Sequence, residues 1–271
     1  MLGGVGYATF IEPEDIGVDR VGIRLQRLPE AFDGLKIAQL SDLHYGPFTG
    51  AREIGAAADH VNALTPDLVL LTGDFITSPL LERTSTPAST PMADAVRCAR
   101  VLSRIRAPLG VFAALGNHDA TVNPGYIAEV LQAAGIRVLR NGRVPLERSG
   151  ARLWLAGVDD VLDGHPRLDL ALAGVPRADA VVLMAHEPDF ADEASRQPVD
   201  LQVSGHTHGG QIRLPLIGAP YLPRLGRKYP YGYYRVRQMQ LYTNRGIGTI
   251  GVPMRFGAPP EVTLFTLKAG V

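Results

Sequence analysis

The chain contains 271 residues, of which 46% are hydrophobic and 20% are charged, so it can bury a sizeable core and lacks the composition of a disordered chain. Its 27 basic and 27 acidic residues cancel, which excludes a global field that would attract nucleic acid or acidic membranes. The single cysteine, Cys98, excludes an intramolecular disulfide framework and a cysteine-rich zinc site. It shares an apolar helical face with Val101 and Leu102, which favours a buried structural thiol over a reactive one.

The first ten residues, MLGGVGYATF, carry no charge and lack the basic start of a signal peptide. We expect residues 1–10 to be a frayed terminus or the remnant of an N-terminal anchor. No run of about 18 apolar residues follows, so the sequence predicts no membrane-spanning segment. These features favour a location in the cytoplasm or peripheral to the inner membrane.

From residue 35 onward, short runs of Val, Ile and Leu alternate with stretches of helical period, which is typical of an α/β fold. The sequence predicts strands at 35–40, 68–72, 110–115, 152–157, 180–185 and 200–204. It predicts helices at 52–64, 92–105, 124–134 and 189–195, with more strands in the tail from 233 to 268. The Pro-, Ser- and Thr-rich segment 77–91 should be a long irregular loop. No linker divides the chain, so we expect one domain over residues 1–271.

Short polar runs stand at the ends of the predicted strands and contain five of the seven histidines. They are SDLH at 41–44, GD at 73–74, GNHD at 116–119, AH at 185–186 and GHTH at 205–208. Loops at the carboxyl ends of strands in an open α/β sheet meet in one crevice, so we expect these side chains to converge. Asp42 with His44, and His206 with His208, stand two residues apart, and in extended backbone each pair would project to one side.

The chemistry of these side chains points to metal ions. Imidazole, carboxylate and amide ligands without thiolate suit Mn, Fe, Zn, Ni or Co. Two Asp, four His and one Asn are more ligands than one four-coordinate ion needs. The sequence therefore predicts two metal ions that share a bridging ligand.

The runs SDLH, LTGDF, LGNHD, AHEPD and SGHTHGG resemble, in order, the signature blocks of calcineurin-like metallophosphoesterases. The resemblance implies a four-layer αββα sandwich, with two central mixed sheets flanked by helices. It also implies a role for each matching side chain. Asp42, His44 and His208 would hold one metal, Asn117, His186 and His206 the other, and Asp74 would bridge them. His118 would contact the phosphate and protonate the leaving oxygen, with Asp119 orienting it.

The tail at 242–248, with Arg255 and Glu261, resembles a bacterial subgroup of this family whose members are often tethered by an N-terminal transmembrane helix. Some of that subgroup act on UDP-diacylglucosamine or on general phosphodiesters. The resemblance implies a hydrolase of phosphodiester, pyrophosphate or phosphomonoester bonds that uses two divalent or trivalent metal ions and a metal-bridging hydroxide. A lipid-linked or nucleotide-sugar diester is the candidate substrate, and peripheral membrane association is a further expectation.

Two alternative functions stay open. A nuclease is disfavoured by the charge balance, so nucleic acid is not an expected partner. A non-catalytic scaffold with the same fold is disfavoured because every ligand position and His118 are present.

Several other residues invite a functional interpretation. Residues 215–235 hold five tyrosines with Arg224, Arg227 and Lys228, and are expected either to wall the active-site cleft and grip an anionic substrate, or to be Pro-rich structural cover. His60 and His165 lie outside the polar runs and are predicted at the surface or in a loop. Asp159 and Asp160 are predicted to be turn residues rather than an acid/base pair. Residues 246–251 match G-x-G-x-x-G but open no predicted helix, so we do not expect a dinucleotide site.

Overall fold

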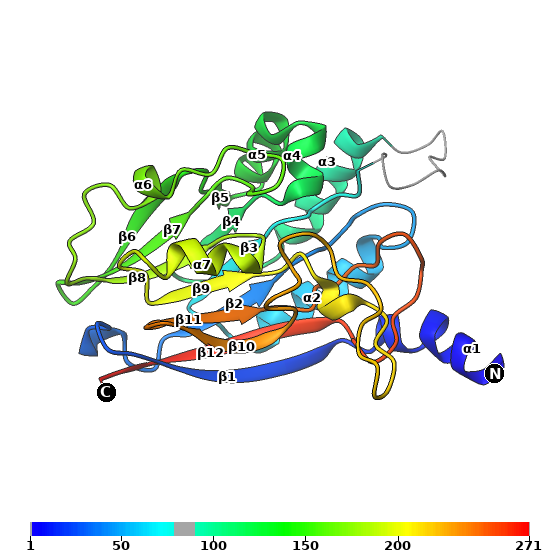
Figure 1. Ribbon diagram of the computed structural model, residues 1–271. Coiled ribbons are helices and arrows are strands. Elements are labelled where there is room, and N and C mark those ends of the chain that lie inside the picture. Colours follow the sequence, from blue (N-terminus) through cyan, green and yellow to red (C-terminus); the bar gives the residue numbers. More distant parts are fainter. Residues whose placement is uncertain (1, 79–89, 271) are drawn as a thin grey trace.

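Two six-stranded mixed sheets form the centre of the fold, in a computed structural model that describes residues 2–78 and 90–270 (Figure 1). The first sheet has the order β1 (Gly17–Leu25), β12 (Glu261–Ala269), β2 (Lys36–Leu40), β3 (Leu68–Thr72), β4 (Val111–Ala114) and β5 (Ile136–Val138). The second sheet has the order β10 (Gly232–Val236), β11 (Met239–Thr243), β9 (Leu201–Ser204), β8 (Ala180–Met184), β7 (Ala151–Gly157) and β6 (Gly142–Arg148).

The inner strands of each sheet run parallel, from β2 to β5 in the first sheet and from β7 to β9 in the second. Parallel strands are covered on both faces, so their sequences are continuously apolar rather than alternating. β3 (LVLLT) and β8 (AVVLM) are accordingly buried at every position. All these strands end on the same side of the molecule, which is where the polar runs of the sequence begin.

Three apolar layers hold the sheets and helices together. Between the sheets, side chains such as Leu70 and Phe112 from one face meet Val182 and Val203 from the other. The outer face of the first sheet packs against α2 (Ala51–Ala63), α3 (Pro91–Leu102) and α5 (Pro124–Ala133). The outer face of the second sheet packs against the short helices α6 (Leu168–Ala171) and α7 (Ala191–Ala194). The predicted four-layer αββα sandwich is confirmed.

The helix boundaries follow local capping chemistry. The side chains of Thr90 and Asn123 accept hydrogen bonds from the backbone N–H groups three residues ahead, and a proline follows each of them at the first helical position. Within a few residues, these boundaries match the predicted helices. The piece predicted at 189–195 is a 3₁₀ turn, η3 (Pro188–Phe190), followed by α7.

The structure adds elements that the sequence analysis does not predict. They are α1 (Leu2–Phe10), α4 (Asn117–Val122), α6, the strands β1, β5 and β6, and the 3₁₀ turns η1 (Glu12–Glu14), η2 (Glu30–Phe32) and η4 (His208–Gly210). β1 pairs with β12, more than 200 residues further along the chain, so no local pattern announces it. The expectation of a frayed start is wrong, because residues 2–10 are helical and the Arg255 N–H donates to the Ala8 carbonyl.

Two further expectations concern single segments. The buried position predicted for Cys98 is confirmed, and burial raises the pKa of its thiol well above the ordinary value. Of the predicted loop 77–91, residues 79–89 lie outside the described residues. In the described ranges, no helix combines the length and the apolar character needed to span a bilayer.

Candidate metal centre

The polar runs converge at one end of the two sheets. Asp42 and His44 follow β2, Asp74 follows β3, Asn117 and His118 follow β4, His186 follows β8, and His206 and His208 follow β9. The first five come from one sheet and the last three from the other. The site therefore lies across the seam between the sheets, as predicted for residues at the carboxyl ends of parallel strands.

Most of the Asp and His residues of this site have a left-handed backbone conformation. The φ angles of Asp42, His44, Asp74, His206 and His208 lie between 45° and 72°, a region that non-glycine residues seldom adopt. The expectation of extended backbone at the two i, i+2 pairs is thus wrong. The strands end before the candidate ligands begin, and His206 and His208, separated by Thr207 in right-handed helical backbone, fall into different ligand groups. Such local strain is typical of functional sites.

Glycines make this crowding feasible. A Cβ on Gly205 would overlap the Ser41 hydroxyl and the Asp42 carboxylate, and a Cβ on Gly116 would overlap the carboxylate of Asp74. Only a residue without a side chain fits at these two positions.

Two groups of three potential ligands form around the seam. One is Asp42, His44 and His208, and the other is Asp74, His186 and His206; within each group the ligand atoms lie within 4.8 Å of one another. Asp74 Oδ2 lies 3.2 Å from His186 Nε2 and 3.5 Å from His44 Nε2, so it faces both groups. Asn117 joins the second group, because its Oδ1 lies 3.1 Å from His206 Nδ1.

Each of three histidines directs one ring nitrogen inward and ties the other to a backbone carbonyl. His186 Nδ1 contacts the Thr72 carbonyl at 2.6 Å, His206 Nε2 that of Arg224 at 2.8 Å, and His208 Nδ1 that of Gly248 at 3.2 Å. Such partners fix the tautomer and the ring orientation of a metal-binding imidazole.

Apart from His206 Nδ1, which contacts Asn117 Oδ1, the inward nitrogens lack ordinary hydrogen-bond partners. The Nε2 atoms of His44 and His208 face each other at 3.0 Å, and His186 Nε2 is buried without a hydrogen bond, since its approach to Asp74 has poor geometry. Neutral imidazole nitrogens with free lone pairs, pointed at buried carboxylates, are what a divalent ion requires. The residues present therefore fit metal ions.

The lowered pKa values of three of the histidines agree with this fit, and His186 is the exception. Burial lowers the pKa of His206 to about 4, and it lowers the pKa of His44 and of His208 well below the ordinary value. Burial acts in the same direction on His186, but the charges of Asp74 and Asp42 outweigh it and raise the pKa of this ring. In the absence of metal, a proton on His186 is thus the cation that the two carboxylates attract, and metal binding would release it.

His118 lies beside the two groups with a different set of contacts. Its Nδ1 accepts a hydrogen bond from the Ser78 N–H at 2.8 Å, and its ring packs edge-on against His44. In the neutral ring the proton therefore sits on Nε2. His118 also forms a third potential ligand group with His44 and Asp74.

The contacts of Asp119 differ from those expected. Its two carboxylate oxygens accept hydrogen bonds from the backbone N–H groups of Asp74, Phe75 and Gly116 at 2.9–3.0 Å, and none from His118. Burial, with the charge of Asp74, raises the pKa of Asp119 to about 8, against the effect of these donors. Asp119 thus fixes the loop that carries Asp74 rather than orienting His118, because it stands at the start of α4, with its carboxylate toward the N–H groups there.

Sequence reasoning missed the layer behind the ligands. The N–H groups of Ile247 and Gly248 donate to the carbonyls of Ser41 and Asp42, and the Gly248 carbonyl accepts hydrogen bonds from both His208 and Arg255. The residues that match G-x-G-x-x-G therefore support the metal ligands and open no helix. The only available signal was that the tail resembles one subgroup of the family.

Arg255 is fully buried, and its guanidinium donates to the carbonyls of Gly248, Arg245 and Ala258 at 2.6–3.0 Å. Burial lowers its pKa to about 10, so it stays charged at neutral pH. We expect Arg255→Met to weaken metal binding about 10–100-fold, since His208 loses its support. The unfolding free energy should also fall, because each unpaired buried carbonyl costs about 1–3 kcal/mol.

Metal titration and thermal melting of Arg255→Met measure the two effects. Arg237→Met, at an exposed position, is the matched control and should change neither. Unchanged metal affinity in Arg255→Met would contradict a supporting role.

A cavity of about 520 Å³ opens beside the two groups of potential ligands. Its lining combines apolar side chains, including Leu162, Ile212, Tyr221, Ile250 and Val252, with the polar residues His44, Asp74, Asn117, His118, His206 and His208. Part of the 215–235 segment lines this cavity, through Tyr221, Pro223 and Arg224. Arg227 and Lys228 do not, because their backbone N–H groups bind the Asp189 carboxylate and the Lys228 ammonium pairs with Asp192 at 2.7 Å.

The remaining candidates take structural roles. Asp159 pairs with Arg140 through two hydrogen bonds of 3.0 and 3.1 Å, and Asp160 accepts the N–H groups of Leu162 and Asp163 within a turn. The prediction of a turn residue is confirmed for Asp160, whereas Asp159 forms an ion pair with Arg140. His60 is exposed on α2, and His165 lies in the loop before α6, also as predicted.

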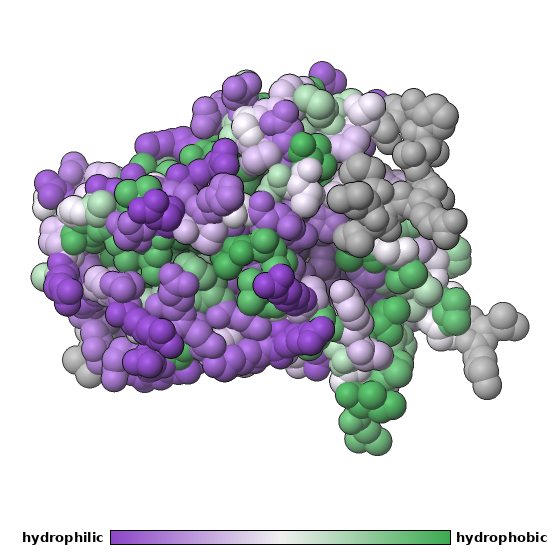
Figure 2. Space-filling model, turned by 45° about the horizontal axis from the view of Figure 1, so that its top comes forward, coloured by the Kyte–Doolittle hydropathy of each residue, from purple (hydrophilic) through white to green (hydrophobic). Residues whose placement is uncertain are grey.

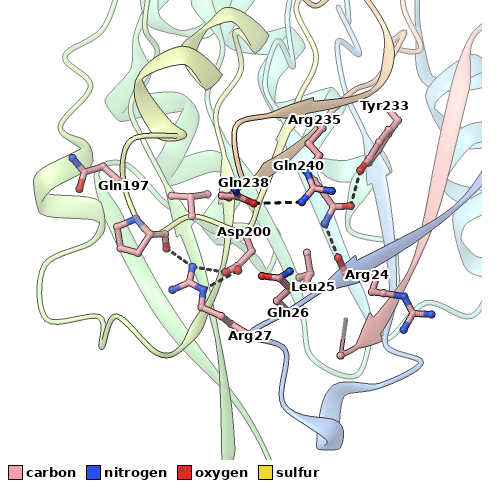
Figure 3. A pocket seen from close by; sticks show the side chains of 13 residues that line it. Arg24, Leu25, Gln26, Arg27, Gln197, Asp200, Tyr233, Arg235, Gln238 and Gln240 are labelled. Atoms are coloured by element: carbon pink, nitrogen blue, oxygen red, sulfur yellow. Dashed lines mark hydrogen bonds and ion pairs between the residues drawn. The ribbon is translucent and has the colours of Figure 1, made fainter.

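A second hollow, of about 420 Å³, lies where β1, the start of β9 and the β10–β11 hairpin meet (Figure 3). Its polar groups bind one another: Arg27 pairs with Asp200 at 2.7 Å, and Gln240 contacts both the Arg24 carbonyl and the Tyr233 hydroxyl. It contains none of the predicted ligands. The candidate metal ligands lie instead at the opposite ends of the strands.

Comparison of the chain with known proteins places it in a family. The family model described as calcineurin-like phosphoesterase matches residues 35–210. The chain is 36% identical to the metallophosphoesterase YkuE of Bacillus subtilis (strain 168), over 98% of this chain and 91% of the relative. It is 32% identical to the phosphodiesterase YaeI of Escherichia coli (strain K12), over 97% of this chain and 93% of the relative.

Two further proteins are similar to this chain. A transmembrane protein with a metallophosphoesterase domain from Danio rerio is 33% identical over 99% of this chain, which spans 60% of that relative. The crystal structure of TT1561 of Thermus thermophilus shares the fold with a TM-score of 0.53 at 10% identity, covering 79% of this chain and 90% of that one. The chain thus belongs to the calcineurin-like phosphoesterase family and is a phosphoric ester hydrolase.

Proposed function

We propose that the protein is a phosphoesterase that depends on a dinuclear metal centre. Asp42, His44 and His208 hold one ion, Asn117, His186 and His206 hold the other, and Asp74 bridges them. The observation that carries this proposal is the position of Asp74 Oδ2, which lies within 3.5 Å of ring nitrogens from both groups. Mn, Fe, Zn, Ni and Co all suit this donor set.

When bound, two such ions supply a hydroxide nucleophile at neutral pH and neutralise charge on the phosphoryl oxygens. The chain's own residues then have to position the ester and protonate the leaving group. His118 is suited to the second task, because Ser78 occupies its Nδ1 and leaves the protonated Nε2 for the leaving oxygen.

The cavity supports a diester substrate with one apolar group. In its lining, Leu162, Ile212 and Tyr221 offer apolar surface, and Arg224 adds a cation. This combination favours a lipid-linked phosphodiester over a nucleotide-sugar diester, since the lining offers few side chains that would hydrogen-bond a base or a sugar. Peripheral association with a membrane is a separate proposal, which rests on the molecular surface.

Activity of metal-reconstituted protein against a panel of esters tests the function. We expect hydrolysis of bis(p-nitrophenyl) phosphate and of a lipid-linked diester to exceed that of p-nitrophenyl phosphate and of a nucleoside diphosphate sugar, and to disappear with a chelator. Fastest cleavage of a single-stranded oligonucleotide would identify a nuclease instead. Absence of hydrolysis by protein that holds two metals would identify a scaffold.

A further inference from the structure

Among the described residues, eight of the fourteen exposed large apolar side chains belong to two short segments, at 5–11 and at 214–221. In and just after α1, Val5, Phe10 and Ile11 are 56–74% exposed. In the loop after η4, Leu216 is fully exposed and Ile217 is 74% exposed. Figure 2 shows green side chains gathered at this end of the molecule, where they form a projecting tip. We call these side chains, with Leu214, Tyr221 and Val252, the apolar rim.

The two segments of the apolar rim lie next to each other because they share one strip of chain. The Arg255 N–H donates to the Ala8 carbonyl of α1, and the carbonyl of the next residue, Phe256, accepts a hydrogen bond from the Arg213 N–H at the base of the loop. Figure 1 shows α1 and the gold loop after η4 projecting from the same end of the molecule. The rim is therefore one surface rather than two scattered patches.

The loop presents a fixed convex tip. Leu214 and Gly218 exchange two backbone hydrogen bonds of 2.8 and 2.9 Å, and Leu216 between them has a φ of 67°. The turn thus holds a leucine in a conformation that leucine seldom adopts, with its side chain fully in solvent. A tip of this shape offers no groove to a protein partner but can enter a soft apolar phase.

The helix and the charge pattern point to the same phase. α1 (LGGVGYATF) contains no charged residue, and a helix that is apolar on all sides is found in a protein core or in lipid. Between Asp200 and Glu261 the chain has eight basic residues and no acidic one, although the whole protein is neutral. Arg255 is buried, and Lys228 and Arg245 pair with carboxylates, so the positive excess of this stretch comes from the other five. Behind α1, Glu12 is buried and Glu14 pairs with Arg52.

We propose that the apolar rim docks the protein on an anionic membrane surface, with the 214–217 tip and α1 entering the interface. Arg213, which stacks 4.2 Å from the Tyr231 ring, and Arg224 then lie at headgroup level, where aromatic and basic side chains gather in membrane-bound proteins. Burial of apolar surface and attraction to anionic lipid add in such an arrangement.

The rim also meets the cavity. Tyr221 and Val252 are exposed members of the rim and at the same time line the cavity beside the metal groups. A docked molecule would open its site toward the lipid surface. If the proposed diester function holds, an ester anchored in the bilayer reaches the metals without leaving it.

Co-sedimentation of the full chain with vesicles tests the docking without any substrate. We expect binding to vesicles of phosphatidylcholine with phosphatidylglycerol, and weaker binding to phosphatidylcholine alone. The double variant Leu216→Ser with Ile217→Ser should lose at least about tenfold in partitioning, because two large aliphatic side chains no longer enter lipid. Leu170→Ser, at an exposed position on α6, is the matched control and should bind normally.

Two results would overturn the docking proposal. One is equal vesicle binding by the double variant and the unaltered protein. The other is a dimer in size-exclusion chromatography that the double variant converts to a monomer, which would make the rim a protein interface. Hydrolysis of bis(p-nitrophenyl) phosphate by the same preparations reports the proposed function separately, and it should be unchanged, since neither residue lines the cavity.

Discussion

Asp74→Ala is expected to abolish hydrolysis and to weaken the binding of both metals. The reason is that Asp74 Oδ2 lies within 3.5 Å of ring nitrogens of both ligand groups. Asp42 Oδ1 is further away, at 3.5 Å from His208 Nε2 and 3.9 Å from His186 Nε2. Removal of the Asp74 side chain also leaves the buried backbone N–H of His118 without a hydrogen-bond acceptor, because that N–H donates to Asp74 Oδ1. Metal content after dialysis, measured beside activity, should show both ions reduced and the rate at the level of metal-free protein.

Two comparisons sharpen this experiment. Asp74→Asn keeps an oxygen for the His118 N–H but removes the charge, so it should also lose metal while retaining the fold. Asp163→Asn changes a carboxyl that belongs to neither ligand group and should keep both ions. Two metals at unchanged occupancy in Asp74→Ala would rule out the bridging role.

His118→Ala is expected to lower the rate by about 10²–10⁴-fold for esters with poor leaving groups, the usual contribution of a general acid. Esters with good leaving groups, such as p-nitrophenolate, need less protonation and should lose less. Metal content should stay intact, because the proposed role of His118 concerns the ester. Rates across a series of aryl diesters of increasing leaving-group pKa measure the difference.

The slope of that series separates two roles of His118. Equal losses for all leaving groups would mean that the ring only positions the phosphate. A loss of one metal ion in the variant would mean that His118 completes the ligand group with His44 and Asp74 instead. His60→Ala, on the exposed face of α2, controls for the removal of a histidine as such.

The layered fold could be predicted because its central strands carry their own signal. Runs such as LVLLT in β3 and AVVLM in β8 are too apolar for a surface, and the helices between them begin at Thr-Pro and Asn-Pro caps. β1 could not be predicted, since its charged and apolar residues make sense only beside β12. The single domain over residues 1–271 stays a prediction.

The convergence of the candidate ligand residues could be predicted, but their backbone geometry could not. Strand ends and residue types announce Asp42 or His206, whereas the left-handed backbone at these positions depends on how the neighbouring loops pack. The role of Asp119 was missed for the same reason. Its carboxylate accepts hydrogen bonds from the backbone N–H groups of Asp74 and Phe75, 45 and 44 residues earlier in the chain, and from that of Gly116. Arg255 gave no signal of its own, as an arginine is ordinarily a surface residue.

The position of the site across the seam has a consequence for stability. The proposed ligands that follow β2, β3 and β4 belong to one sheet and those that follow β8 and β9 to the other, so an ion bound as proposed would tie the sheets together. By mass action, every increment of metal affinity is then an increment of resistance to separation of the sheets. Under the same proposal, a substitution that loosens the packing between the sheets, for example at Phe112 or Leu155, should weaken metal binding. Under this proposal, metal binding and the packing between the sheets are thermodynamically linked.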